Sequence, residues 1–396
     1  MDPNWKTTAN FILLPELKLI NQWQQDKFRT NYKCFKESDF EVCPRCAVKS
    51  YSVHDRRWVR LKDQPIRGAG IGLHVLKRRF RCPSCKKVFT EPVQGVTKGF
   101  RTTSRYRRGL RWACENFKDL KRVQRAFACS SWLCHKVFYE QLEIKYRERS
   151  NNPWGKKLGI DEHTWRKRRG KKRLTEFASL VFDHDRRRIA EVVNGKTVQS
   201  LKDALDYIPG RERVEEVTID MCDPFKKFVR EFFTNAKLTA DKFHVLRLTN
   251  PIINKARTEI TGDHRSNPVR TLLLRNRHRL KYFEKSALDK WLDHHPKMKE
   301  IYWFKELLYQ FYRTKGFDRA SRAFTNLTDK MALSSLDEIK KLRRTLMKWR
   351  TEILHYFKSG LTNARTEGYN RLAKGEQYSS FGVRSFINYR LRLLNI

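Results

Sequence analysis

The sequence predicts an α/β protein in which one mixed sheet forms the centre, a long all-α insertion interrupts it, and two small modules precede it. Three observations support this fold class. Short apolar runs ending in Asp161 and Asp220 are typical of buried strands that deliver a carboxylate to a sheet edge. Helical periodicity fills residues 246–357, and two Cys-Pro-x-Cys pairs lie in the first quarter of the chain. The 396 residues are enough for two or three domains with a sizeable core.

Residues 1–98 are predicted to contain strands and a zinc-binding module. The apolar segment 11–15 and the alternating stretch through Phe35 indicate a strand or hairpin, and residues 73–81 indicate a further strand. Each Cys-Pro-x-Cys pair can turn tightly and present two thiolates to one ion, and a hairpin is expected between the pairs. The expected zinc ligands are Cys43, Cys46, Cys82 and Cys85. Four thiolates leave no open position for water, so zinc there would be structural; unliganded thiols that repeat by chance are the alternative.

Residues 99–150 are predicted to form a helix-turn-helix-like DNA-binding module. Thr103 or Ser104 can cap a first helix, Asp119 can start a second, and a turn near residues 129–130 opens a third. On the third helix the side chains expected to face inward are Trp132, Val137 and Leu142. The basic side chains expected to contact DNA are Arg105, Arg108, Arg111 and Lys136. The alternative is a helical linker whose basic residues form a solvated face.

Residues 151–245 and 358–396 are predicted to form the two parts of one core. The expected elements are strands over 157–161, 174–183 and 188–194, a helix over 197–207, a strand over 214–220, a helix from Asp223, and a strand over 236–240. Three strands, a helix, a strand, a helix and a strand match the order of a ribonuclease-H-like core. The first and fourth strands are neighbours in that fold, so Asp161 and Asp220 would lie side by side.

The insertion over residues 246–357 is predicted to be helical throughout. Apolar residues recur at spacings of three and four, as at Ile339, Leu342 and Leu346. The aromatic residues of this segment are expected in a core rather than as base-stacking platforms. Gly360 ends the run, and the last segment, 358–396, is expected to form a helix that carries Glu367.

The charge of the chain predicts a polyanionic partner. Lysine and arginine number 86 against 43 acidic residues, which gives a formal net charge of +43. Neutralising phosphates releases condensed counterions, so double-stranded DNA is the expected partner. A membrane surface is the competing partner, but no run approaches the roughly 18 apolar residues of a spanning helix. The nine cysteines, two close pairs among them, and the lack of a signal peptide predict a bacterial cytoplasmic, nucleoid-associated protein.

A basic run follows the first predicted strand of the core. Its members expected to contact phosphate are Arg168, Arg169, Lys171 and Lys172. A charge run is usually a solvated turn, and that alternative stays open here. Phosphate contact is expected because this basic run is close to Asp161 in the sequence.

Several motifs together resemble one known family. They are the Cys-Pro-x-Cys pairs with the basic segment 77–81 between them, Ile160-Asp161-Glu162, Asp220, Asp241-x-Phe243-His244, residues 349–354, and Glu367-Gly368-x-Asn370. In these motifs the chain is similar, over nearly its whole length, to the DDE insertion-sequence transposases of the ISL-three group. The resemblance implies a DNA transposase that binds the terminal inverted repeats of its element, cuts DNA and transfers the strand to a target. It also implies a homodimer or larger assembly on the element ends and target DNA. One departure is Ala47, which stands where a glycine is common after the first cysteine pair.

Three acidic residues, Asp161, Asp220 and Glu367, are the expected catalytic residues. Hydrolysis and transesterification of a phosphodiester both need an activated oxygen and a stabilised leaving group, which two Mg²⁺ ions about 3.5–4 Å apart can supply. Hard cations of this kind take carboxylate oxygens as ligands. Asp161 is expected to bind both ions, Asp220 one ion and Glu367 the other.

Alternatives remain open for both the site and the function. Asp241 and His244 could replace Asp220 as metal ligands, or orient the site by hydrogen bonds. Asn363 and Asn370 share the helix face of Glu367 and could position DNA or that glutamate. The competing functions are a catalytically silent DNA-binding regulator derived from a transposase, and a metal-dependent nuclease without strand transfer.

Overall fold

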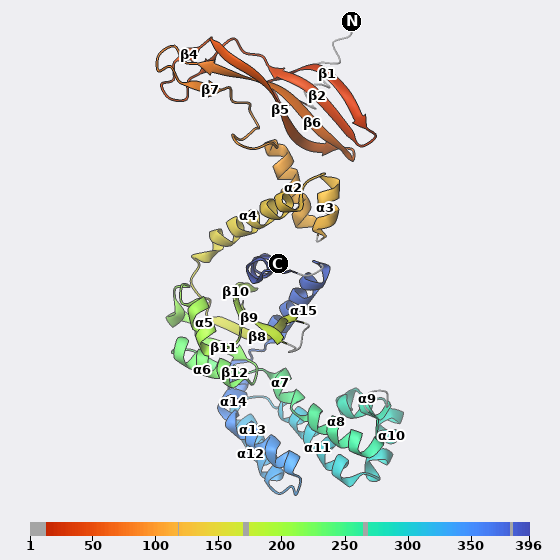
Figure 1. Cartoon of the computed structure of the whole chain (residues 1–396). Coiled ribbons are helices and arrows are strands. Elements are labelled where there is room, and N and C mark those ends of the chain that lie inside the picture. The colour runs from red at the N-terminus through yellow and green to blue at the C-terminus, as the bar shows by residue number, and fades with distance from the viewer. Residues whose placement is uncertain (1–12, 118, 169–173, 264–267, 381–382) are drawn as a thin grey trace. The chain divides into compact units, whose positions relative to one another are not determined.

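The computed structural model describes residues 13–117, 119–168, 174–263, 268–380 and 383–396 (Figure 1). The chain falls into two compact units. The first unit contains Met1–Lys145 with Ser379–Gly382, and the second contains Tyr146–Tyr378 with Val383–Ile396. The finer division into five segments stays a prediction.

A five-stranded sheet forms the centre of the first unit. Its strands are β1 (Leu17–Asp26), β2 (Arg29–Lys36), β5 (Val53–Ile66), β6 (Ala69–Arg81) and β7 (Val88–Thr90). The order is β1-β2-β6-β5 with β7 beside β6, and only β2 and β6 among these neighbours run parallel. Alternate residues such as Tyr32, Leu61 and Leu73 are buried in a core on one face of the sheet. The β5–β6 hairpin confirms the hairpin expected between the cysteine pairs.

Each cysteine pair lies in a tight turn. β3 (Glu41–Val42) and β4 (Lys49–Ser50) flank the first turn, and β6 and β7 flank the second. The Ala47 amide donates to the Cys43 carbonyl at 2.9 Å, and the Lys86 amide donates to the Cys82 carbonyl at 3.1 Å. Ala47 and Lys86 have positive φ angles of 56° and 61°. Glycine adopts this left-handed backbone without steric cost, so a glycine would fit position 47 better than alanine does.

Three helices follow the sheet in sequence. They are α2 (Ser104–Asn116), α3 (Leu120–Ala126) and α4 (Ser131–Ser150). The Thr103 hydroxyl accepts from the Tyr106 amide at the start of α2, and Asp119 accepts from two amides at the start of α3. These caps satisfy amides that have no partner inside the helix. Both predicted helix starts are therefore confirmed.

The third of these helices differs from the prediction in its first turn. Val137 and Leu142 are buried as expected, but Trp132 is 67% exposed. The expectation that Trp132 faces inward is wrong. The buried stripe of α4 starts at Cys134, and two residues correspond to about 200° around a helix. Trp132 therefore lies on the opposite side from Cys134.

A second five-stranded sheet forms the centre of the second unit. Its strands are β8 (Lys157–Arg168), β9 (Leu174–Asp183), β10 (Arg188–Asn194), β11 (Glu216–Ile219) and β12 (Lys237–Ala240). The order is β10-β9-β8-β11-β12; the first three strands are antiparallel, while β8, β11 and β12 run parallel. The predicted contact between the first and fourth strands, β8 and β11, is confirmed. This mixed sheet with its helices is consistent with a ribonuclease-H-like core.

The first strand of this sheet is longer than predicted. β8 continues through Arg168 instead of ending at Asp161, because His163 and Trp165 are also buried and extend the alternation. Arg168 therefore pairs with Leu174 on β9 and belongs to the strand rather than to the turn that follows it.

Helices cover both faces of the second sheet. On one face, Leu158 and Ile160 belong to a core shared with α5 (Val198–Leu205) and α6 (Asp223–Phe232); the short helix η1 (Arg211–Arg213) precedes β11. On the other face, Trp165 belongs to a core shared with α15 (Ala364–Ser379) and α16 (Phe386–Leu394). Residues 159, 161 and 163 of β8 have the same parity as Trp165 and thus face α15 and α16.

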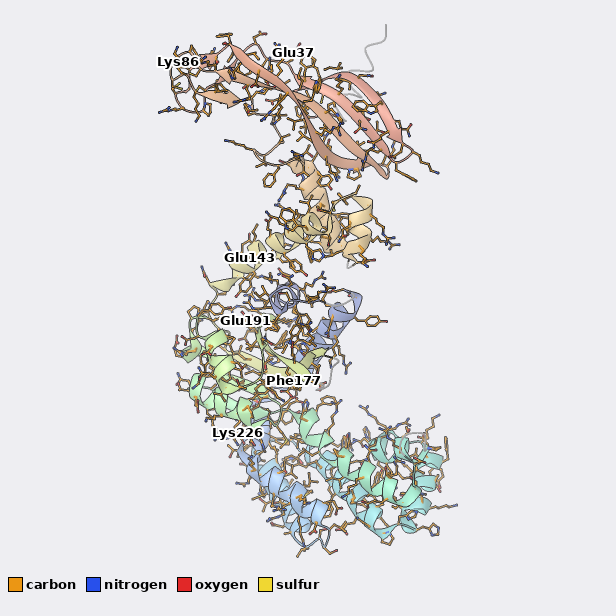
Figure 2. The ribbon with its side chains drawn as sticks, viewed as in Figure 1. Glu37, Lys86, Glu143, Phe177, Glu191 and Lys226 are labelled. Atoms are coloured by element: carbon orange, nitrogen blue, oxygen red, sulfur yellow. The ribbon has the colours of Figure 1, made fainter. Side chains whose placement is uncertain are left out.

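Buried charges tie the helices of the second unit together. Glu191 of β10, labelled in Figure 2, is 1% exposed. It accepts hydrogen bonds from Tyr146, Tyr207 and Arg390. Lys226 of α6 lies 2.7 Å from the buried Glu352 carboxylate. A buried carboxylate is costly unless it is paired, and these partners satisfy that need.

The insertion is helical, as predicted. Its elements are α7 (Lys242–Arg247), α8 (Thr249–Thr261), α9 (Pro268–Leu274), η2 (Arg277–Arg279), α10 (Tyr282–Asp293), α11 (Pro296–Phe311), α12 (Phe317–Ala332), α13 (Asp337–Lys348) and α14 (Arg350–Ser359). Ile339, Leu342 and Leu346 are buried in its core, as their spacing predicts. Gly360 ends α14 with a φ of 65°, a left-handed conformation that glycine readily adopts. Within the described residues, none of the helices has the length and apolar character needed to cross a membrane.

Candidate active site and cysteine cluster

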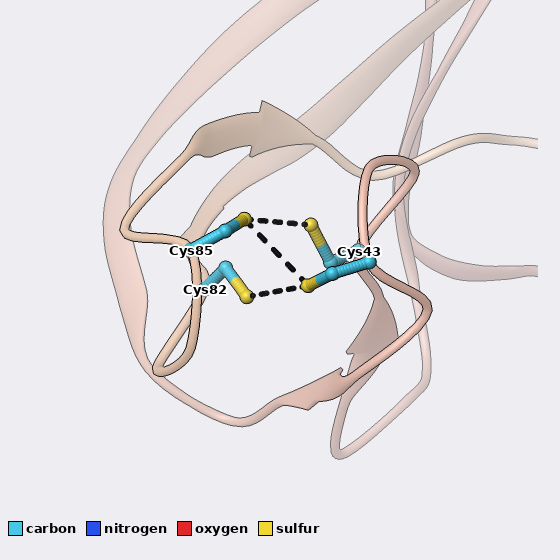
Figure 3. A group of neighbouring side chains, drawn as sticks. Cys43, Cys82 and Cys85 are labelled. Atoms are coloured by element: carbon cyan, nitrogen blue, oxygen red, sulfur yellow. Dashed lines mark hydrogen bonds between the residues drawn. The ribbon is translucent and has the colours of Figure 1, made fainter.

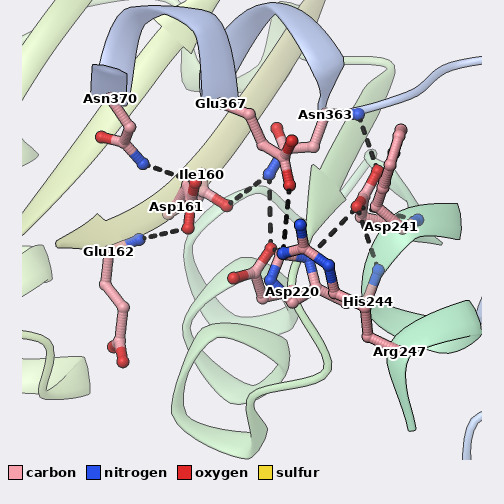
Figure 4. Close-up of polar contacts among 11 residues, drawn as sticks. Ile160, Asp161, Glu162, Asp220, Asp241, His244, Arg247, Asn363, Glu367 and Asn370 are labelled. Atoms are coloured by element: carbon pink, nitrogen blue, oxygen red, sulfur yellow. Dashed lines mark hydrogen bonds and ion pairs between the residues drawn. The ribbon is translucent and has the colours of Figure 1, made fainter. Parts of the chain in front are cut away.

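Three aspartates occupy equivalent positions on three neighbouring parallel strands. Ile219 of β11 pairs with Ile160 of β8 on one side and with Ala240 of β12 on the other. The next residue on each strand is Asp220, Asp161 and Asp241, respectively. Because the three strands are parallel and in register, these side chains lie in a row across the sheet (Figure 4).

Asp241 has its oxygens occupied by protein donors. Oδ2 accepts from the Phe243 and His244 amides, which caps α7, and Oδ1 accepts from the Asn363 amide at 2.9 Å. The side chain is fully buried. Asp241 therefore joins the start of the insertion to the segment that leads into α15.

His244 links two of the aspartates. Its Nδ1 lies 2.9 Å from Asp220 Oδ1 and 3.1 Å from Asp241 Oδ2. Burial opposes the charged imidazole, but the hydrogen bonds to both carboxylates raise the pKa of His244 to about 10. The protonated ring places a positive charge between the two carboxylates. Asp220, Asp241 and His244 each offer a ligand atom within 4.8 Å of the others.

Asp161 is a buried carboxylate with a perturbed pKa. It is 6% exposed and accepts from the Glu162 amide at 2.7 Å and from the Asn370 side chain. Burial, followed by the charge of Asp220 beside it, raises the pKa of Asp161 to about 7. Two carboxylates that face each other in a buried site favour a bound cation, so the donor set fits a divalent metal.

A chain of hydrogen bonds runs from α16 to Asp161. The Asn370 amide nitrogen donates to Asp161 Oδ2, which leaves Asn370 Oδ1 to accept from His163 Nδ1 at 2.9 Å. His163 Nε2 then accepts from the Tyr389 hydroxyl at 2.7 Å. Burial lowers the pKa of His163, so the ring is neutral and carries its single proton on Nδ1. Each of these four side chains is at most 6% exposed, and the chain fixes one orientation of Asp161.

Glu367 lies on α15, the helix that faces Asp161. Figure 4 shows its carboxylate pointing from the helix toward Asp161 and Asp220. Its side chain is 17% exposed, and Arg247 Nη1 lies 4.0 Å from Oε1. Asn363 and Asn370 flank it, and Asn363 Nδ2 donates to the Ile160 carbonyl at 3.3 Å. α15 therefore contributes Asn370 and the third carboxylate, and the residue just before the helix, Asn363, contributes the second amide that contacts β8.

A glycine lets α15 approach β8 closely. A Cβ on Gly159 would lie 2.7 Å from Asn363 Oδ1, 2.8 Å from His184 Nε2 and nearer still to Thr366 Oγ1. These three polar atoms are buried without a hydrogen-bond partner among the described residues. Burial, followed by the charge of Arg365, lowers the pKa of His184 to about 4, so that ring is neutral.

The four predicted cysteines form one cluster in the first unit (Figure 3). Cys46 Sγ lies 3.4 Å from Cys82 Sγ and 3.6 Å from Cys85 Sγ, and Cys43 Sγ lies 3.6 Å from Cys85 Sγ. Tetrahedral zinc with Zn–S bonds of about 2.3 Å separates its sulfurs by about 3.8 Å. Burial opposes ionisation of Cys43, but hydrogen bonds from the Arg45 and Cys46 amides help to lower the pKa of its thiol to about 6. The cluster fits a structural zinc ion.

The residues expected to contact DNA lie in different environments. Arg105 is paired with the buried Asp63, so its charge is engaged within the first unit. Arg108 is exposed and Arg111 is half-buried on α2. Lys136 lies 4.9 Å from the centre of the Trp132 ring. Residues Arg169, Lys171 and Lys172 lie outside the part of the chain that the structure describes, and so does the side chain of Arg168.

Sequence reasoning did not identify His163, Tyr389 or His184 as part of this site. For His163 a signal was present, because it follows Asp161 by two residues on a strand and must share its face. For Tyr389 and His184 no local pattern indicates proximity to the carboxylates.

The second unit has a mixed sheet with acidic side chains at equivalent positions of neighbouring parallel strands, and the same chain carries a four-cysteine cluster. This arrangement is expected for a DDE-type enzyme with a zinc ribbon. A model of the DDE transposase family of the ISL3 group matches residues 158–393. A second model, described as the zinc-finger of transposase IS204/IS1001/IS1096/IS1165, matches residues 39–85. The chain belongs to the ISL3 family of insertion-sequence transposases. Family membership implies that the protein binds DNA.

One characterised relative extends the similarity beyond the catalytic region. The transposase for insertion sequence element IS1001 of Bordetella parapertussis is 23% identical over 382 residues, which cover 92% of this chain and 90% of that protein. The similarity therefore includes both compact units, and the resemblance drawn from the motifs is confirmed.

Proposed function

We propose that this transposase cuts and joins DNA at the ends of its insertion sequence, with Asp161, Asp220 and Glu367 as the catalytic residues. The observation that carries the proposal is the row of carboxylates on β8 and β11, with Glu367 directed at them from α15. Duplex DNA carries phosphates that a chain of net charge +43 attracts. The site thus combines a polyanionic substrate with ligands suited to divalent cations.

Asp220 is the better candidate for the second catalytic carboxylate than Asp241. Both oxygens of Asp241 accept hydrogen bonds from backbone amides, and its side chain has no exposed surface. Asp220 accepts from His244 through Oδ1, and its side chain is 15% exposed. We assign Asp241 and His244 to positioning Asp220, because His244 contacts both carboxylates.

The three carboxylates would hold two Mg²⁺ ions. When bound, these ions would polarise the phosphate and make the attacking oxygen more acidic. The protein residues hold this arrangement in place. Asn370 orients Asp161, His244 orients Asp220, and Arg247 places a positive charge next to Glu367. Water and a DNA 3′-hydroxyl are the two attacking groups that strand cleavage and strand transfer would use.

The first unit supports recognition of the terminal inverted repeats. The cysteine cluster with zinc would fix the β3–β4 and β6–β7 turns, and the α2–α4 helices carry exposed basic residues such as Arg108. Joining two element ends requires that two active sites act together, so we propose a homodimer or larger assembly on DNA.

The test is cleavage of a supercoiled plasmid that carries the element ends, in Mg²⁺, by the wild type and by Asp220→Asn and Asp241→Asn. We expect cleavage at the repeats to vanish in Asp220→Asn and to persist, at a reduced rate, in Asp241→Asn. The reverse pattern would assign Asp241 as the ligand and refute our choice.

The same assay separates the competing functions. Cuts at the repeats without joined products would indicate a nuclease that lacks strand transfer. Repeat binding without cleavage in Mg²⁺ or Mn²⁺ would indicate a DNA-binding regulator, and the row of carboxylates would then have no catalytic role.

A further inference from the structure

The outer face of the first sheet, opposite its hydrophobic core, carries an unusual set of side chains. Strand register aligns them in rows. One row consists of Trp23, Asn31, Gly72 and Lys62; the next consists of Asn21, Lys33, His74 and Arg60; a third includes Phe35, Leu76 and Trp58. Residues paired across strands point to the same face, so these rows form one surface, called here the aromatic–basic face.

Two tryptophans of this face are exposed. Trp23 is 38% exposed and Trp58 is 46% exposed. Trp23 meets the His74 ring edge-on at 4.8 Å, and Lys33 lies 4.6 Å from the centre of the Trp58 ring. Each indole is therefore held in place by a neighbour on the sheet while part of its ring remains accessible. Strand spacing and rise place the backbone positions of the two tryptophans roughly 20 Å apart across the sheet.

A cavity of about 540 Å³ opens on this face next to Trp23. The sheet supplies one wall, and Phe127 and Ala128 at the end of α3 supply another. Gly70 and Gly72 leave the sheet wall without side chains, and a Cβ on Gly72 would overlap Asn31 Oδ1. Asn31 is 4% exposed and lies over Gly72, where its amide donates to Gln25 at 3.3 Å. The cavity is thus a built recess with an indole on its rim and an amide on its wall.

The charge of the cavity is positive. Arg29, Arg60, Lys62 and Arg101 line it. Among the described residues that line it, Asp63 is the one carboxylate, and it is 2% exposed and held by Arg105 and Thr103. Burial, followed by the charges of Arg60 and Lys33, lowers the pKa of His74, so His74 adds no charge near neutral pH. The recess would therefore attract phosphate.

We propose that the aromatic–basic face binds single-stranded DNA, with bases stacked on Trp23 and Trp58 and phosphates on the surrounding arginines and lysines. Accessible indoles set among cations are the features that proteins use to bind single strands, because every base has a flat face that can stack. Base pairs in a duplex stack on each other and leave no face for an indole. The proposal rests on the proposed function only in taking DNA as the partner, since catalysis plays no part in it.

The test measures binding of the full-length protein to a labelled oligothymidylate, without divalent ions, by anisotropy and tryptophan fluorescence. An abasic strand of the same length carries the same charge without bases. We expect the wild type to bind the oligothymidylate more tightly than the abasic strand, with quenching of tryptophan emission. Trp23→Ala and Trp58→Ala should each weaken oligothymidylate binding about tenfold and leave abasic binding unchanged.

Two further variants make the result decisive. Trp23→Phe keeps an aromatic ring and should restore most of the affinity that Trp23→Ala loses. Trp303→Ala, at an exposed tryptophan of α11 in the second unit, should bind like the wild type. The proposal would be overturned if Trp23→Ala and Trp58→Ala bound the oligothymidylate as tightly as the wild type does. It would also be overturned if these variants lost as much affinity for duplex repeat DNA as for the oligothymidylate. A protein that fails to cut DNA would still give the expected result, so a failure of the proposed function is distinguishable.

Discussion

Gly159→Ala should separate the catalytic helix from the strand that carries Asp161. The added methyl would lie 2.7 Å from Asn363 Oδ1 and closer to Thr366, both at the start of α15. Ordinary contacts to carbon are about 3.5–4 Å, so the helix must move by about 1 Å. Overpacking of this kind costs about 1–3 kcal/mol of the free energy of unfolding.

The effect on activity should exceed the effect on stability. Glu367 lies one residue beyond Thr366, and a displacement of about 1 Å at a catalytic group can reduce the rate about 100-fold. The assay is single-turnover cleavage of repeat DNA in Mg²⁺, with urea unfolding and circular dichroism on the same preparations. Binding of repeat DNA should stay at the wild-type level, because the substitution lies in the second unit.

Gly375→Ala is the matched control. It makes the same substitution on α15, where the new methyl meets nothing within 4 Å, and alanine should stabilise the helix by about 0.5–1 kcal/mol. Wild-type cleavage and stability in Gly159→Ala would refute the close packing of α15 on β8. Equal losses of activity in both variants would show that α15 tolerates no change at all and would refute the argument from position 159.

Three further predictions concern other parts of the structure. Tyr389→Phe removes the hydroxyl that donates to His163. Cleavage should fall about tenfold, because a buried acceptor without its partner costs about 1–3 kcal/mol. An unchanged single-turnover rate at equal DNA affinity would contradict the role of the hydrogen-bond chain from Tyr389 to Asp161. Cys46→Ser should lose bound zinc in a metal analysis and weaken repeat binding, while Cys129→Ser, outside the cluster, should retain both. His184 has a pKa lowered to about 4, so its stabilising effect is complete above pH 6.5 and declines as the pH falls toward 4. From pH 7.5 to 5.5 the wild type should lose about 1 kcal/mol more unfolding free energy than His184→Gln; parallel urea midpoints at both values would refute this.

Much of the catalytic sheet could be predicted because its strands carry strong local signals. The apolar run 180–182 and the β-branched segment 217–219 indicated buried strands, and helix-period spacing indicated the insertion. The order of these elements then placed Asp161 beside Asp220. The cysteine cluster was predictable for a similar reason, because paired spacing of a reactive residue type carries its own geometry.

Other features depend on contacts that no local pattern encodes. Tyr389 reaches His163 from far along the chain, and Asp241 is engaged by Asn363, a residue beyond the insertion. The exposed position of Trp132 shows a different error. Its hydrophobic character predicted burial, but its position on α4 places it on the side of the helix opposite the buried stripe. Strand length was underestimated at Asp161 because His163 was not read as a buried residue.

The hydrogen bond between the Asn363 amide and Asp241 joins the two ends of the insertion at the edge of the catalytic sheet. A segment whose ends are fixed side by side behaves as a closed loop. The entropy of closing such a loop grows slowly, by about 0.6 kcal/mol for each doubling of its length. A change in the length of the segment between these ends should therefore cost little closure entropy. The helix α14 is the exception within it, because Glu352 is paired with Lys226 of α6 and α14 packs on β12 of the catalytic sheet.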